Sequence, residues 1–149
     1  MRTLILGLGN PILKDDGVGI KIAQKIKQGN PELEVVETSE AGLALLEYAA
    51  DYDKLIIIDS IRTEGGEPGE VYTLELGDLK PAMDLSASHG IDIATAFELG
   101  EKLGYQMPKL VSIYAVEIKD NSTFGEECTE EVEKRTPFIA KQIMEREKL

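Results

Sequence analysis

Short runs of apolar residues recur along the chain with the lengths of buried strands. Residues 3–8 form one such run, and residues 55–58 form an uninterrupted Leu-Ile-Ile-Ile sequence, typical of a strand buried on both faces of a parallel sheet. This second run is expected to end at Asp59. Residues 71–76 alternate instead, which predicts a strand near an edge of the sheet. Two further strands are expected at residues 34–37 and 109–116.

Apolar residues at helical spacing follow most of these predicted strands. The recurrence of Val18, Ile22 and Ile26 predicts a first helix over residues 16–27, which should stop at Gly29. Three further helices are expected at residues 41–50, 90–103 and 129–145, and residues 77–88 are expected to form a loop. Alternating strands and helices favour right-handed parallel βαβ units. We therefore predict one domain over residues 1–149, a three-layer α/β/α fold with about five mostly parallel strands and helices on both faces.

Composition narrows the class of protein and its partners. The 149 residues carry a net charge of -12, which argues against binding to nucleic acid or to an anionic membrane. No apolar run approaches the roughly 18 residues that a membrane span needs. The single cysteine, Cys128, cannot form an internal disulfide, and we interpret it as structural. A cytoplasmic location is therefore expected.

The turn after the first strand carries the first candidate chemistry. Gly7, Gly9 and Asn10 break the strand, and the pair Asp15-Asp16 then lies at the start of a helix. In open α/β sheets, sites are built outside the carboxyl ends of the strands. A dinucleotide site is disfavoured, because Ile12 replaces the third glycine of the usual pattern and the acidic pair would repel a pyrophosphate. We therefore expect no cofactor-binding residues here.

Asp59 and His89 are predicted to lie near the same edge of the sheet as Asp16. Asp59 follows four buried aliphatic residues, where a carboxylate must be solvated, paired or bound to a cation. A residue that only caps the next turn is the alternative. His89, the only histidine, precedes a predicted helix. Two converging carboxylates require a cation or a shared proton, and with an imidazole they suit a divalent metal such as nickel or zinc.

The spacing of the N-terminal residues resembles that of a known family. The pattern Gly7-x-Gly9-Asn10-x-x-x-x-Asp15-Asp16-Gly17-x-Gly19 is similar to the signature of the NiFe-hydrogenase maturation endopeptidases. Weaker similarities are Ala41-Gly42-Leu43, Ile58-Asp59-Ser60 and Ser-x-Ser-His89-Gly. One departure is the stretch Glu37-Thr38-Ser39-Glu40, which stands where the family often has Asp-Gly-Gly-Thr.

The resemblance implies an endopeptidase that removes a C-terminal extension from the large-subunit precursor of a NiFe-hydrogenase after nickel insertion. It implies that Asp16, Asp59 and His89 contact the metal and act in catalysis. Nickel would be delivered by the substrate, so the free enzyme need not hold a metal. The attacking water would be held by the metal or activated by a carboxylate. A monomer is expected, with the precursor as partner.

Two other classes of protein remain as alternatives. A phosphoacceptor receiver domain is also doubly wound, and Asp15, Asp16, Asp59 and Lys119 can be placed on its acidic and basic positions. That interpretation gives His89 no role. The other alternative is a non-catalytic module that binds nickel or the nickel-bearing precursor without cleaving it.

Overall fold

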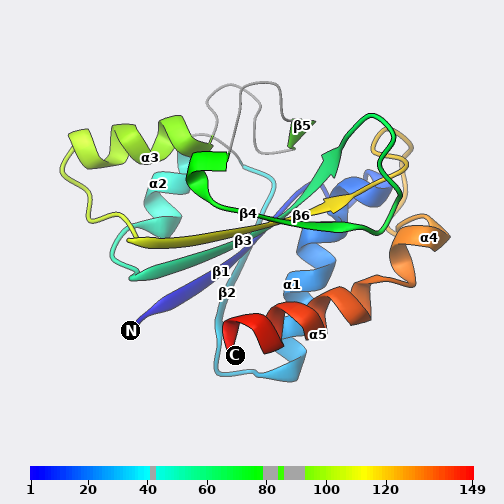
Figure 1. The fold of residues 1–149 in the computed structure, drawn as a ribbon, viewed down its shortest axis with the longest axis horizontal. Helices are drawn as coiled ribbons and strands as arrows, with labels where there is room; N and C mark the ends of the chain where they lie inside the picture. Colours follow the sequence, from blue (N-terminus) through cyan, green and yellow to red (C-terminus); the bar gives the residue numbers. More distant parts are fainter. Residues whose placement is uncertain (41–42, 79–83, 86–92) are drawn as a thin grey trace.

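The central feature of the fold is a twisted, mostly parallel sheet. The computed structural model describes residues 1–40, 43–78, 84–85 and 93–149. Within these residues the strand order is β2-β1-β3-β6-β4, and β5 pairs with β3 outside this path (Figure 1). The strands are β1 (Thr3–Leu8), β2 (Glu34–Thr38), β3 (Lys54–Arg62), β4 (Val71–Leu74), β5 (Asp84–Leu85) and β6 (Leu110–Glu117). β1, β2, β3 and β6 are parallel, and β4 lies antiparallel at one edge. The predicted fold class is confirmed.

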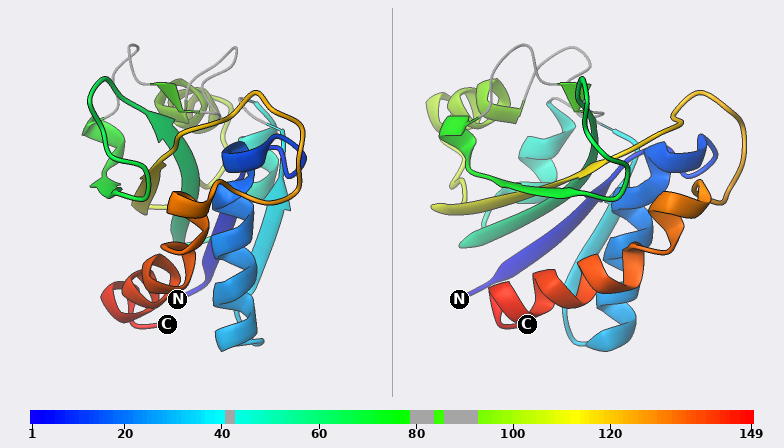
Figure 2. Two further views of the ribbon diagram at one scale, coloured as in Figure 1. Left: turned by 90° about the vertical axis from the view of Figure 1, so that its right-hand side faces the viewer. Right: turned by 45° about the vertical axis from the view of Figure 1, so that its right-hand side comes forward.

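Helices cover both faces of the sheet, because alternate residues of the central strand are apolar on each side. Ile56 and Ile58 pack in one core with α1 and α5, whereas Leu55 and Ile57 pack in the other with α2 and α3 (Figures 1 and 2). The helices are η1 (Lys14–Gly17), α1 (Val18–Gly29), α2 (Ala44–Ala49), η2 (Leu76–Asp78), α3 (Ile93–Lys102), α4 (Glu130–Glu133) and α5 (Thr136–Glu147). No helix among the described residues is long and apolar enough to cross a bilayer.

Three predicted boundaries are wrong. β3 does not end at Asp59 but continues to Arg62, because β6 supplies a parallel partner as far as Ile61. The expected loop at residues 77–88 contains β5, which at two residues is too short to show a hydrophobic pattern. The predicted last helix is divided into α4 and α5, with a proline in the first turn of the second. The predicted starts of the second and third helices, at residues 41 and 90, lie outside the described residues.

Glycines allow α1 to lie directly against the backbone of β1 and β3. A Cβ atom on Gly19 would lie 2.3 Å from the carbonyl oxygen of Ile58 and 2.6 Å from that of Leu8. A Cβ atom on Gly9, whose φ is 148°, would lie 2.0 Å from the carbonyl oxygen of Asp16. Only glycine fits both positions. This close packing brings η1, and with it Asp16, against the carboxyl end of β1 and against residues 58–60 of β3.

A polar cluster ties the last helix to the sheet. Glu147 of α5 accepts a hydrogen bond from the Tyr114 hydroxyl and forms a salt bridge with Lys54, and both charged side chains are largely shielded from water. Burial acts to raise the pKa of Glu147, but the hydrogen bonds from Lys54 and Tyr114 outweigh it and hold that pKa below its ordinary value of 4.5. The ionised carboxylate therefore contributes to stability.

We expect Glu147→Gln to lower the free energy of unfolding at pH 7 by on the order of 1 kcal/mol. Because the folded pKa of Glu147 is depressed, its contribution is present above the unfolded value and is lost as the pH falls through the folded value. Thermal melts at pH 7 and pH 3.5 should therefore show the gap between wild type and variant narrowing in acid. Glu145→Gln, an exposed position of the same helix, is the control and should change neither melt. A gap of equal size at both pH values would contradict the prediction.

Candidate functional site

Ser60 connects the two carboxylates that the sequence singled out. The backbone N–H of Ser60 donates to Oδ1 of Asp59 at 2.8 Å, and its hydroxyl donates to Oδ1 of Asp16 at 3.4 Å. The other oxygen of Asp16, Oδ2, accepts the backbone N–H of Asn10 at 2.9 Å. Asp16 comes from η1 and Asp59 from β3, 43 positions apart in the chain, and Ser60 contacts the first through its hydroxyl and the second through its backbone N–H.

The two carboxylates differ in their access to solvent. Asp59 is fully buried and lies inside β3, in register with Ala115 of β6. Asp16 is half-buried, in a short turn just before α1. An ionised carboxylate at such a position must be compensated by hydrogen-bond donors or by a cation. Asp16 is the member of the pair that an incoming group can reach.

Asp15 has a different role from its neighbour. It is fully buried and accepts backbone N–H groups from Lys119 at 3.0 Å, Asp120 at 3.0 Å and Thr129 at 2.7 Å. The hydroxyl of Thr129 donates to its Oδ2 at 2.8 Å. All these donors belong to the segment 118–129, which Asp15 therefore fastens to η1.

Cys128 lies beside this buried carboxylate and is structural. Its Sγ contacts the carbonyl oxygen of Lys14 at 3.8 Å. Burial, with a smaller contribution from the charge of Asp15, raises the pKa of the Cys128 thiol to about 12. The thiol is therefore protonated at neutral pH and is no nucleophile.

A buried carboxylate that sequence reasoning did not single out lies at the carboxyl end of β6. Glu117 accepts the backbone N–H of Thr63 at 2.9 Å and the hydroxyls of Thr63 and Tyr72. A Cβ atom on Gly66 would lie 1.9 Å from its Oε1, so the chain after β3 folds closely over this carboxylate. Glu117 thus stabilises the connection between β3 and β4 through the hydrogen bonds that it accepts.

His89 lies outside the described residues. Among the residues that the structure does describe, no three His, Cys, Asp or Glu side chains are grouped closely enough to hold a metal ion. The roles of Asp16, Asp59 and His89 as metal-contacting and catalytic residues therefore stay a prediction. Two carboxylates are a donor set that fits a divalent cation but leaves further ligands to be supplied.

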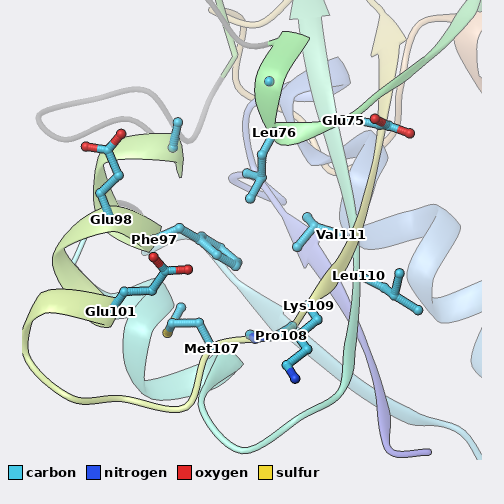
Figure 3. A pocket seen from close by; sticks show the side chains of 12 residues that line it. Glu75, Leu76, Phe97, Glu98, Glu101, Met107, Pro108, Lys109, Leu110 and Val111 are labelled. Carbon is cyan, nitrogen blue, oxygen red and sulfur yellow. The ribbon is translucent and has the colours of Figure 1, made fainter.

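A separate cavity of about 810 Å³ lies at the opposite end of the strands. It is formed by α3, η2 and the start of β6, with Phe97 pointing from α3 toward Val111 of β6 (Figure 3). Glu98 and Glu101 of α3 also line it. Neither Asp16 nor Asp59 is among its lining residues, so this cavity is not part of the carboxylate site.

The receiver-domain alternative finds little support in this geometry. Asp59, the position that would accept a phosphoryl group, is fully buried. Asp15 is enclosed by donors from the chain, and Nζ of Lys119 lies 3.2 Å from Oε2 of Glu131. A receiver needs these groups to face one exposed site.

The mostly parallel sheet with helices packed on both faces places the chain in the class of doubly wound α/β proteins. Within that class, residues 18–146 match the family model described as HycI, hydrogenase maturation protease. The match covers most of the chain, and the chain therefore belongs to the hydrogenase maturation protease family.

Individual relatives agree with the family match. Hydrogenase 2 maturation protease of Escherichia coli K12 is 36% identical over 77 residues, which is 50% of this chain and 47% of that protein. The hydrogenase expression/formation protein HupD of Rhizobium leguminosarum is 30% identical over 77 residues, 50% of this chain and 38% of that protein. The chain thus spans about half or less of these relatives' length in the matched regions.

Solved structures resemble this fold over nearly its whole length. The hydrogenase maturating endopeptidase HybD of E. coli superposes with a TM-score of 0.77 at 25% identity, covering 98% of this chain and 91% of that one. The NiFe-hydrogenase maturation protease HybD of Thermococcus kodakarensis gives a TM-score of 0.71 at 26% identity, covering 98% of both chains.

Proposed function

We propose that this chain is an endopeptidase that removes the C-terminal extension of a NiFe-hydrogenase large-subunit precursor after nickel has been inserted. The observation that carries the proposal is the junction at Ser60, whose two donors reach Asp16 and Asp59. Membership of the hydrogenase maturation protease family supports the reaction class. The names of the structural relatives, one a maturating endopeptidase and the other a maturation protease, support it as well.

Nickel enters this proposal as part of the substrate. Asp16, Asp59 and His89 bind it when the precursor docks, and the metal compensates the two carboxylate charges. The course of the chain is compatible with His89 as the third ligand. Leu85 of β5 pairs with Ile61, two residues beyond Asp59, and His89 follows Leu85 by four residues, a length of at most about 14 Å.

The proposed chemistry is hydrolysis of one amide bond. A water held at the site attacks the scissile carbonyl carbon, and Asp16 accepts its proton because Asp16 is the more accessible of the two carboxylates. The C–N bond then breaks, and the proton passes to the leaving amine. Asp59, fixed inside β3, serves as a ligand of the nickel. The bound nickel orients the water and stabilises the developing negative charge.

The test is a comparison of two substrates. Purified protein is incubated with a nickel-loaded and with a nickel-free large-subunit precursor, and the mass of each precursor is followed over time. We expect shortening of the nickel-loaded form only. Binding of the loaded precursor without any loss of mass would identify a non-catalytic module and overturn the proposal. Equal shortening of both forms would leave the peptidase activity but refute nickel recognition.

A further inference from the structure

Two large apolar side chains are exposed beside the carboxylate site. Phe124 is 79% exposed and Ile12 is 48% exposed. They lie on neighbouring segments, because the backbone N–H of Gly125 donates to the carbonyl oxygen of Ile12 at 2.8 Å and that of Lys14 donates to Gly125 at 2.9 Å. Figure 2 shows the segment 118–129, in yellow and orange, arching next to the blue turn that precedes α1.

Both segments are bonded to the elements that carry the carboxylates. The first leads directly into η1, where the backbone N–H of Asp16 donates to the carbonyl oxygen of Leu13 at 3.0 Å. The second reaches the end of β3 through a hydrogen bond from Nη1 of Arg62 to Oδ1 of Asn121 at 3.2 Å. The pair Ile12 and Phe124 is therefore continuous with the candidate site.

The segment that presents Phe124 is held in place before any partner binds. The buried carboxylate of Asp15 accepts hydrogen bonds at both ends of it. In its middle, Oδ1 of Asp120 accepts the backbone N–H groups of Ser122 and Thr123, each at 3.0 Å. A braced segment that keeps a large aromatic side chain in water has no benefit for the isolated fold, but it lowers the entropic cost of binding a partner.

We infer that Ile12 and Phe124 form a docking surface for an extended stretch of the precursor next to its scissile bond. This inference rests on the proposed function. An endopeptidase must hold the chain beside the bond it cuts, and these are exposed apolar side chains on the two segments bonded to the carboxylate-bearing elements. The bound stretch carries a large apolar side chain. Exposed Glu126 and Glu127 follow Phe124, so neutral or basic neighbours fit the charge of this surface.

The test separates binding from cleavage. Phe124→Ala and Ile12→Ala are compared with wild type for processing of a nickel-loaded large-subunit precursor, and binding of the same precursor is measured by titration. We expect Phe124→Ala to raise KM and the dissociation constant about tenfold and to leave kcat within twofold, because truncating an exposed aromatic anchor removes binding energy and not chemistry. Phe124→Leu should restore most of the affinity.

Phe138→Ala is the matched control, because Phe138 is 65% exposed on α5, away from segment 118–129, and its loss should change neither constant. Wild-type KM and affinity in Phe124→Ala would overturn the inference and leave the peptidase function standing. If wild type binds the precursor without cutting it, the proposed function fails. Weaker binding by Phe124→Ala would in that case still support the docking surface. A self-associating wild type that Phe124→Ala renders monomeric would show that a second copy is the occupant, which also overturns the inference.

Discussion

Asp16→Asn should abolish processing of a nickel-loaded precursor while the protein keeps its fold. An asparagine can still accept the backbone N–H of Asn10 through its carbonyl oxygen and can direct its amide toward the Ser60 hydroxyl. What it loses is the negative charge that holds a cation and the base that takes a proton from water. We expect kcat/KM to fall by about a thousandfold or more and the free energy of unfolding to change by less than about 1 kcal/mol.

The measurement combines mass analysis of the precursor with urea unfolding of each variant. Glu101→Gln removes an exposed carboxylate from the far end of α3 and should process precursor at the wild-type rate. Asp59→Asn and His89→Ala are expected to lose activity like Asp16→Asn. Wild-type processing by Asp16→Asn would rule out a catalytic role for this carboxylate.

Gly19→Ala should produce a large loss of stability from a single methyl group. The added Cβ would lie 2.3 Å from the carbonyl oxygen of Ile58 and 2.6 Å from that of Leu8, and both are backbone atoms of central strands that cannot rotate away. Relief requires α1 to move off the sheet. We expect a cost of about 3 kcal/mol, at the upper end of overpacking effects, and impaired processing because η1 and Asp16 move with the helix.

Urea unfolding followed by circular dichroism measures this cost. Gly77→Ala is the matched control, because a Cβ atom there would meet nothing within 4 Å. Gly29→Ala is a second comparison: its Cβ would contact only the end of the flexible Met144 side chain, so a small effect is expected. An unfolding midpoint for Gly19→Ala equal to that of Gly77→Ala would contradict the close packing of α1 on the sheet.

The main elements could be predicted from sequence because their signals are local. The run at residues 55–58 indicated a central strand buried on both faces, and β3 has that position between β1 and β6. Glycines after the first strand indicated the turn into α1. The extent of β3 could not be predicted, because Asp59 and Ser60 look like the end of a strand until β6 is known to pair with them.

The candidate site was predicted less completely, because it too depends on contacts between residues that are far apart in the sequence. Which of Asp15 and Asp16 faces the site depends on donors from residues 119–129, about a hundred positions away. No local pattern carries that information. Four points stay predictions: the role of His89 in the site, the delivery of nickel by the substrate, the monomeric state and the cytoplasmic location.

The position of Asp59 within a hydrogen-bonded strand limits how this scaffold could be redesigned. Moving that carboxylate would require shifting β3 against β6, which would break the backbone hydrogen bonds between the two strands. The turn containing Ile12 and the arch containing Phe124 lie outside the strand ladder, and exchanging their exposed side chains leaves their backbone hydrogen bonds in place. Libraries aimed at a protease with a new cleavage preference should therefore randomise these two rim segments and leave the strand untouched.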